Sequence, residues 1–301
     1  MVINWENSIN LKNILKFLLF DYISRVNPIF CRIRFKKSST ERMIEMALIQ
    51  CQFYSQVLNL CTSMTVILPE PSIIGNKSNQ FPEKKYQTLY LLHGLSDDDT
   101  IWTRRTSIER YVSSLRLAVV MPQVHHSFYT DMKYGNKYWT FLTKELPLLA
   151  QSFFPLSTAR KDNFVAGLSM GGYGALKWAL NHPETFSAAA SLSGVTDIVK
   201  RKVDQPDGIF NLIFGDEELT GTEHDLFALI KKTHECEEKP IIYQCCGTED
   251  FLYEDNLRFK KFCEEANYPL TTKFEQGNHE WGYWDQAIQE VLDWLPLNKG
   301  Q

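Results

Sequence analysis

The chain reads Asn163-Phe164-Val165-Ala166-Gly167-Leu168-Ser169-Met170-Gly171-Gly172-Tyr173-Gly174-Ala175-Leu176 between residues 163 and 176. An apolar run typical of a buried strand leads into a Gly-x-Ser-x-Gly pattern, and a helical pattern follows it. A turn this tight strains the backbone at its centre, so glycines at positions 167 and 171 avoid clashes there. The turn exposes the hydroxyl of Ser169 at a helix N-terminus, which favours developing negative charge. We therefore interpret Ser169 as a candidate nucleophile.

Short apolar strands alternate with amphipathic helices on both sides of this turn, from Ala47 onward. This rhythm is typical of βαβ units and predicts an α/β fold, with a mostly parallel sheet of about eight strands and helices on both faces. No helical pattern separates the first two strands, so we expect them to pair antiparallel. The predicted strands are Gln50–Val57, Met64–Leu68, Thr88–Leu92, Leu117–Met121, Asn163–Ala166, Ala188–Leu192, Pro240–Cys245 and Thr271–Glu275.

Composition limits the partners of the chain. Its 301 residues are 44% hydrophobic and 23% charged, which is enough for one large core, and the formal net charge is −4. Because nucleic-acid binding needs a clustered basic surface, we expect no nucleic-acid partner. A small neutral or acyl compound fits this composition better as a substrate, and the sequence leaves a homo-oligomer open.

The seven cysteines are scattered and form no Cys-x-x-Cys pair. We interpret them as reduced thiols of a cytoplasmic protein, most of which are packing residues. The neighbouring His125 and His126 have no carboxylate or cysteine at ligand spacing, so we expect no metal site.

Residues 1–45 differ in character from the rest of the chain and end in a basic stretch that includes Arg32, Arg34 and Lys36. Three accounts compete for this extension: a mis-assigned start upstream of Met46, an amphipathic helix at a membrane surface, or a partner-binding arm. We favour the first. The apolar stretch 14–20 contains Lys16 and predicts neither a signal peptide nor stable membrane insertion. Residues 46–301 are then one catalytic domain, with a cap-like excursion at about 197–240.

A serine nucleophile needs a histidine base and a carboxylate that orients it. His279 follows the last predicted strand and precedes the last helix, and Asp250 follows the strand before it. The resulting chain order Ser169, Asp250, His279 is that of hydrolases with this strand–turn–helix motif. Asp197, one strand earlier, is the second candidate for the acid, and Glu249 is the third.

Two backbone N–H groups should stabilise the oxyanion that forms during attack. The amide of Met170 directly follows the nucleophile, and the second donor should come from the loop after the third strand, which reads His93-Gly94-Leu95. Gly94 lets the backbone approach a substrate closely, so we expect the amide of Leu95 to be that donor. The ring of His93 is expected to brace the loop rather than to react.

These motifs, together with Ser127-Phe128-Tyr129-Thr130-Asp131, Glu145-Leu146-Pro147 and Gly277-Asn278-His279-Glu280-Trp281, resemble the esterase D-like branch of the α/β-hydrolases. That branch includes tributyrin esterases, S-formylglutathione hydrolases, feruloyl esterases and mycolyltransferases. The resemblance covers roughly residues 46–297 and is closest to bacterial tributyrin esterases. It implies an α/β-hydrolase fold without a cofactor, with Ser169, Asp250 and His279 as the triad and Leu95 and Met170 as the oxyanion donors.

The resulting hypothesis is a serine carboxylesterase that hydrolyses short-chain acyl esters of the tributyrin or acetyl type through an acyl-enzyme. The alternatives are an S-formylglutathione hydrolase and an acyltransferase, because both use the same triad. A non-catalytic binding module is disfavoured, since all three triad members are present. The segment 127–129 and the excursion 197–240 are expected either to shape the acyl pocket or to pack a cap helix.

Overall fold

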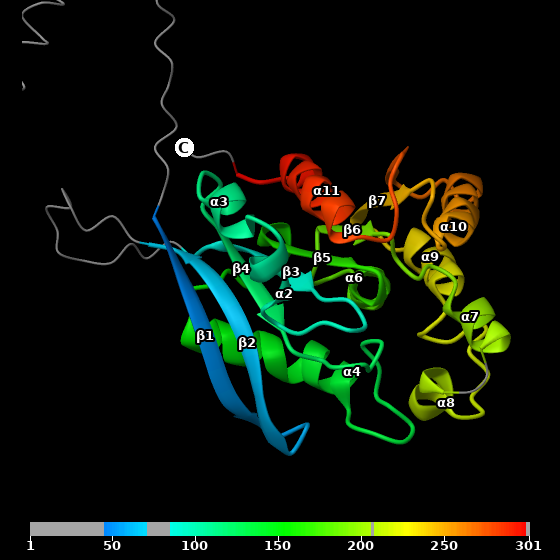
Figure 1. The fold of residues 1–301 in the computed structure, drawn as a ribbon, viewed down its shortest axis with the longest axis horizontal. Helices are drawn as coiled ribbons and strands as arrows, with labels where there is room; N and C mark the ends of the chain where they lie inside the picture. Colours follow the sequence, from blue (N-terminus) through cyan, green and yellow to red (C-terminus); the bar gives the residue numbers. More distant parts are fainter. Residues whose placement is uncertain (1–44, 71–84, 206–207, 299–301) are drawn as a thin grey trace, which may run out of the picture. The chain divides into compact units, whose positions relative to one another are not determined.

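The computed structural model describes residues 45–70, 85–205 and 208–298, and all but Glu45 of the predicted extension 1–45 lies outside them. Eight strands form one sheet (Figure 1). They begin and end close to the predicted positions: β1 Met46–Ser55, β2 Leu60–Pro69, β3 Gln87–Leu92, β4 Leu117–Pro122, β5 Asn163–Leu168, β6 Ala188–Leu192, β7 Ile241–Gly247 and β8 Leu270–Glu275.

The spatial order of the strands is β1-β2-β4-β3-β5-β6-β7-β8. β2 pairs antiparallel with both β1 and β4, and every later neighbouring pair is parallel. The mostly parallel sheet and the antiparallel first pair are therefore confirmed. In a parallel sheet the loops after the strands gather at one edge, which is where open α/β sheets bind their ligands.

Helices cover both faces of the sheet, as the alternation predicted (Figure 1). Buried side chains form two clusters, one on each face. Helices of the first face are α4 Tyr138–Thr140, α5 Leu146–Phe153, α6 Met170–Asn181, α9 Leu226–His234 and α10 Tyr253–Glu265; those of the second are α2 Ile101–Arg105, α3 Ile108–Val112 and α11 Trp281–Trp294. A short 3-10 turn, η2 Arg160–Asp162, precedes β5.

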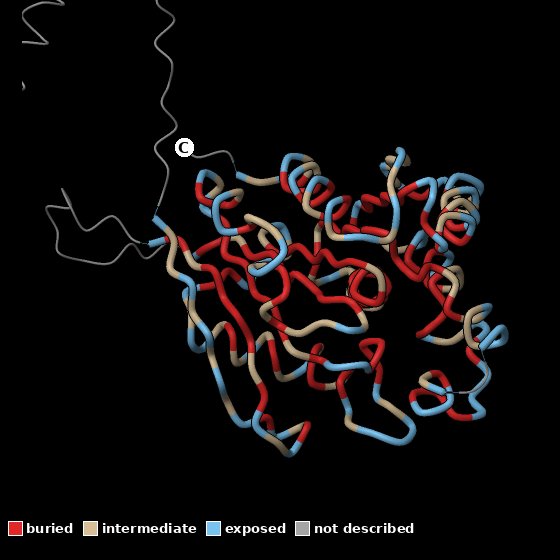
Figure 2. Tube along the Cα trace, viewed as in Figure 1, coloured by how far each residue is buried: buried red, intermediate tan, exposed pale blue. Residues whose placement is uncertain are grey.

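Central strands are buried on both sides, so they are apolar along their whole length rather than alternating with polar residues. In β3, Leu89 and Leu91 belong to one cluster while Tyr90 and Leu92 belong to the other. Figure 2 shows these buried strands at the centre, and the exposed residues on the outer helices and loops. The sheet therefore gives a rigid base to the loops that follow its strands.

The helical pattern over residues 138–153 is interrupted in the structure. A π-helical turn, η1 Phe141–Glu145, separates α4 from α5, and the N–H of Leu146 donates to the carbonyl of Phe141. Pro147 lies directly after it, and a proline ring clashes with the carbonyl four residues earlier in a regular α-helix. Widening the turn before Pro147 relieves that clash.

The excursion 197–240 contains α9 and two further helices that the sequence did not predict, α7 Ile198–Asp204 and α8 Ile209–Phe214. Phe210 and Phe214 of α8 are buried, and the ring of Phe210 lies 5.1 Å from that of Phe128. The two segments expected to shape a pocket thus pack against each other. Within the described ranges, no helix is long and apolar enough to cross a membrane.

Candidate active site

Ser169 lies between the end of β5 and the start of α6. Its φ of 53° and ψ of −117° place it in a region that side-chain-bearing residues rarely adopt. The backbone of β6 fixes it there, because the N–H of Ser169 donates to Leu192 O over 2.9 Å. Strained backbone of this kind persists only where its surroundings hold it, and it clusters at functional sites.

The glycines of this turn are required by space. A Cβ at Gly167 would lie 2.3 Å from the carbonyl oxygen of Gly171, and one at Gly171 would lie 2.5 Å from Leu92 O. Both contacts are with backbone atoms, which cannot move aside without disturbing the strands. The sequence argument for glycine at both positions therefore has a direct steric basis.

Ser169, His279 and Asp250 form a continuous chain of hydrogen bonds. Oγ of Ser169 lies 3.0 Å from Nε2 of His279, and Nδ1 of the same ring lies 2.8 Å from Oδ2 of Asp250. An ionised carboxylate accepts hydrogen bonds only, so Nδ1 carries the proton and Nε2 presents its lone pair to the serine hydroxyl. This is the tautomer that a general base for Ser169 needs.

The carboxyl group of Asp250 is fully buried, whereas the ring of His279 is partly exposed. Burial alone would raise the pKa of Asp250, but the hydrogen bonds from His279 and from Leu252 N–H lower it below its usual value. The bond from Leu252 N to Oδ1 measures 2.8 Å. Asp250 is therefore held ionised and oriented with its second oxygen toward His279.

The loops after β7 and β8 are tied together. Glu249 N donates to Gly277 O over 3.0 Å, and a Cβ at Gly247 would lie 2.2 Å from the same oxygen. This close packing brings Asp250 and His279 together although they are 29 positions apart in the chain.

The two alternative acids lie elsewhere. Asp197 caps α7 by accepting from Lys200 N, and its other oxygen forms an ion pair with Arg258 at 3.0 Å. Glu249 is exposed and accepts from the side chain of Gln276. The carboxylate that contacts His279 is that of Asp250.

Of the two expected oxyanion donors, Met170 directly follows Ser169 in the chain, and Leu95 belongs to a loop that packs against the turn of Ser169. Met170 is the first residue of α6, so its N–H has no partner within the helix. The loop that carries Leu95 packs against the residue before the serine, because a Cβ at Gly94 would lie 2.7 Å from Leu168 Cδ1. The loop after β3 and the turn after β5 therefore meet at Ser169.

His93 is a buried link between two loops. Its Nδ1 lies 2.7 Å from Gly94 O, and its Nε2 accepts a hydrogen bond from Val124 N over 3.1 Å. Burial lowers the pKa of His93 to about 4, so the ring is neutral near pH 7. It braces the loop that carries Leu95, as its sequence position suggested.

The pair His125 and His126 lines a surface pocket of about 330 Å³, together with Asp97 and Tyr138. The ring of His125 lies edge-on to Tyr138, with the centroids 5.9 Å apart. In the part of the chain that the structure describes, no group of three or more histidine, cysteine, aspartate or glutamate side chains is arranged to hold a metal ion.

Aromatic side chains surround His279. The ring of Phe251 lies 4.6 Å from it and is 65% exposed, while Trp284 lies perpendicular to it at 4.8 Å. Trp281 packs edge-on against Trp284 at 5.3 Å. These rings restrict the imidazole and give the site an apolar wall.

The sequence assigned no role to Lys177, which the structure buries completely inside the first face. Burial lowers the pKa of this amine to about 7. A lysine within a helical pattern is usually an exposed residue, so the sequence held no signal for it. One feature could have suggested its burial: Lys177 lies among apolar neighbours on a helix that is buried along most of its length.

The fold and the Ser–His–Asp geometry together define an α/β-hydrolase. A family model covers residues 55–295, and the chain belongs to the Esterase family. Membership of this family confirms the resemblance drawn from the sequence motifs, and the protein is a hydrolase.

Three known proteins show how similar the chain is to members of this group. It is 30% identical to an acetyl esterase of Caldicellulosiruptor saccharolyticus over 83% of this chain and 98% of that protein. It is 39% identical to the structure of FphF, a fluorophosphonate-binding serine hydrolase of Staphylococcus aureus, with a TM-score of 0.77 over 83% and 98% of the two chains. An S-formylglutathione hydrolase from the same organism is 40% identical, with a TM-score of 0.75 over 83% and 99%.

Proposed function

We propose that this protein is a serine carboxylesterase that hydrolyses short-chain acyl esters through an acyl-enzyme on Ser169. The observation that carries the proposal is the hydrogen-bonded chain from Ser169 Oγ through His279 to Asp250. The similarity to an acetyl esterase supports a short acyl chain. The excursion 197–240 is proposed as a cap over this catalytic domain.

In the proposed reaction, Ser169 Oγ bonds to the carbonyl carbon of the ester while His279 Nε2 takes the hydroxyl proton. The amides of Leu95 and Met170 donate to the oxyanion that forms. The bond to the alcohol then breaks, and the imidazolium returns its proton to the leaving oxygen. Water repeats these steps on the acyl-enzyme, which releases the carboxylic acid and restores Ser169. Asp250 stays ionised and stabilises the imidazolium.

Replacing Ser169 with alanine tests the proposal. We expect Ser169→Ala to lower kcat on a short-chain nitrophenyl ester by about 10⁴-fold or more, because the nucleophile is lost. A fluorophosphonate should label the wild type at Ser169 and leave the variant unlabelled. Near-normal turnover by a folded Ser169→Ala protein would rule the mechanism out.

The alternative substrate is S-formylglutathione, because the chain is 40% identical to an S-formylglutathione hydrolase of S. aureus. Acyl transfer to an alcohol other than water is the other alternative, with the same triad. Values of kcat/KM for acetyl, butyryl and feruloyl esters and for S-formylglutathione distinguish a short-chain esterase from an S-formylglutathione hydrolase. Product analysis with an added alcohol or sugar detects transfer.

We also propose a cytoplasmic location. Six cysteines lie in the described part of the chain, and all are free thiols there. Free thiols are typical of a reducing compartment such as the cytoplasm.

A further inference from the structure

Lys177 lies two turns after the nucleophile on α6, and its amine has uncharged partners. Nζ donates to the carbonyl of Tyr129 and to Oγ1 of Thr130, each over 3.1 Å, and it lies 4.2 Å from the ring centre of Trp139. Burying an amine without a direct carboxylate partner is costly. The two hydrogen bonds and the contact with Trp139 must therefore offset the free-energy cost of burying this amine.

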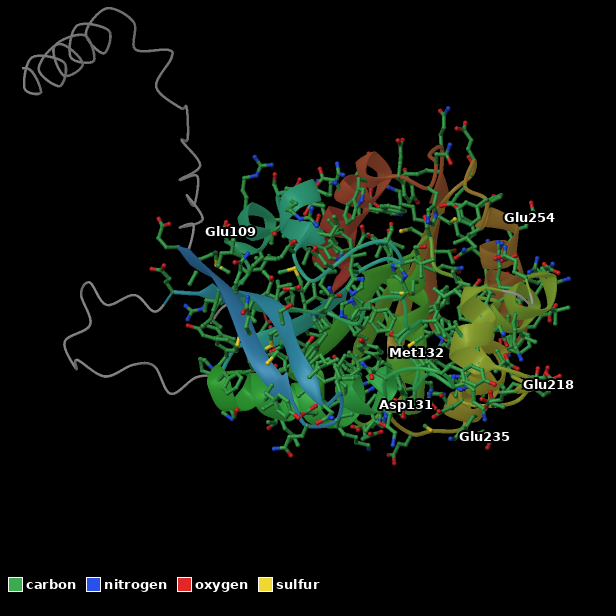
Figure 3. The ribbon with its side chains drawn as sticks, turned by 60° about the horizontal axis from the view of Figure 1, so that its bottom comes forward. Glu109, Asp131, Met132, Glu218, Glu235 and Glu254 are labelled. Atoms are coloured by element: carbon green, nitrogen blue, oxygen red, sulfur yellow. The ribbon has the colours of Figure 1, made fainter. Side chains whose placement is uncertain are left out.

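The two partners of Lys177 belong to a turn with unusual backbone geometry. Phe128 and Tyr129 have φ values of 49° and 53°, so two consecutive residues with side chains are left-handed. Each such residue costs roughly 1 kcal/mol or more. Hydrogen bonds from Tyr129 N to Ser127 Oγ and from Thr130 Oγ1 to Phe128 O hold the turn from within. Lys177 holds it from outside. Asp131 and Met132, which directly follow the turn, are labelled in Figure 3.

Tyr129 continues this chain of contacts to the loop after β3. Its hydroxyl donates to the carbonyl of His93 over 2.9 Å, and both residues are buried. Its ring packs directly on α6, because a Cβ at Gly174 would lie 2.4 Å from it. Tyr129 therefore touches the helix that begins at Met170 and the loop that contains Leu95.

We infer that Lys177 is a positioning residue for the oxyanion hole: through Tyr129 and His93 it fixes the loop of Leu95 relative to the N-terminus of α6. This inference rests on the proposed function, in which those two elements supply the donors. An oxyanion hole works only if both donors are held in place before the charge develops. The sheet fixes β3 and the start of α6, and the buried contacts from Lys177 through Tyr129 fix the position of the loop after β3 relative to α6.

Two variants break the link at different points. Lys177→Met removes the amine and keeps a stem of similar length, and Tyr129→Phe removes the hydroxyl that holds His93. We expect each to lower kcat by about tenfold with KM changed less than about twofold, since losing one oxyanion donor outright costs about 10²–10³. The double variant should be no more than about threefold slower than the slower single variant, because the two residues act through one path.

Thr233→Val is the matched control. Thr233 of α9 is buried, and its hydroxyl donates to the carbonyl of Leu180. Leu180 lies on α6, the helix of Lys177, but it is not a partner of the turn at 128–129. Valine keeps the shape and removes the hydrogen bond, so the control should lower the melting temperature without changing kcat. It separates a loss of general stability in α6 from a loss of position at the oxyanion hole.

Folding is checked by circular dichroism and sites are counted by fluorophosphonate titration. Unchanged kcat in a folded Lys177→Met protein would overturn the inference, as would kcat losses in the two variants that multiply in the double variant. If Lys177→Met does not fold, Tyr129→Phe decides by the same kcat and KM criterion. Failure of the proposed function would be seen separately: the wild-type enzyme would be active, but fluorophosphonate would not label its Ser169.

Discussion

At the scale of single residues, the carboxyl group of Asp250 has the most demanding environment in the site. It is fully buried, yet the hydrogen bonds from His279 and Leu252 N–H hold its pKa below the usual value. A buried carboxylate with satisfied hydrogen bonds keeps both its charge and its direction. The proposed reaction needs both properties, because the imidazole must stay in one tautomer and its cation must be stabilised.

We predict that Asp250→Asn lowers kcat/KM for a short-chain ester by about 10³–10⁴-fold, because an amide in this place favours the wrong imidazole tautomer. Asp197→Asn is the control, since Asp197 pairs with Arg258 rather than His279. It should stay within about threefold of the wild type. The opposite ranking, measured by steady-state kinetics, would move the role of the acid to Asp197.

The proximity of Ser169, His279 and Asp250 was predictable because these residues follow strands in an order that the fold dictates. A Gly-x-Ser-x-Gly pattern between a strand and a helix gives Ser169, and the ends of the last two strands give Asp250 and His279. Lys177 was not predictable in this way. Its burial depends on the turn at 128–129, which packs on α6 only once the whole sheet has formed.

At the scale of elements, the π-helical turn η1 after α4 is held by hydrogen bonds to the β1–β2 hairpin at the edge of the sheet. Glu145 at its end accepts hydrogen bonds from the hydroxyl of Ser55 and from the amides of Gln56 and Val57. These groups form the turn between β1 and β2, about ninety positions earlier in the chain. One carboxylate thus holds the outer hairpin against the helix.

We predict that Glu145→Ala lowers the free energy of unfolding by roughly 2–3 kcal/mol, because three donors at the β1–β2 turn lose a charged acceptor. The value of kcat per folded molecule should not change, since this edge is far along the sheet from β5. Denaturant unfolding followed by fluorescence gives the free energy. Lys144→Ala, at the exposed neighbouring position, is the control and should have little effect. A stability loss below about 0.5 kcal/mol would contradict this account.

Elements differed in how far the sequence predicted them. All eight strands were predicted because central strands are long apolar runs bounded by turn residues. The short helices α7 and α8 were missed because six or seven residues give less than two helical turns of periodicity. Their positions depend on contacts such as those between Phe210 and Phe128, which join segments far apart in the chain.

At the scale of the whole molecule, three buried basic groups share one property: burial lowers the pKa of each. It lowers the pKa of His93 to about 4, of His224 to about 3 and of Lys177 to about 7. His224 packs against Phe214 of α8, with the ring centroids 5.2 Å apart. These groups lie on separate elements, so their protonation affects the free energy of unfolding of the whole domain.

We predict that stability rises with pH between about 5 and 8.5. Up to a pH of about 6.5 the unfolded chain protonates its histidines, whereas the folded chain keeps His93 and His224 neutral. Above about 7 the unfolded chain still protonates its lysines, whereas the folded chain keeps Lys177 largely neutral. In both ranges the unfolded state binds more protons, so stability rises with pH. Asp250 acts in the same direction on acidification, because its lowered folded pKa makes protonation destabilising. Above about 9 the buried thiols of Cys245 and Cys263, with pKa values raised to about 12, act in the opposite direction. Melting temperatures at constant ionic strength measure this, and Lys177→Met should flatten the slope between pH 7 and 8.5. A wild-type melting temperature that rises as the pH falls from 7 to 5 would show that the buried imidazoles are charged in the folded protein.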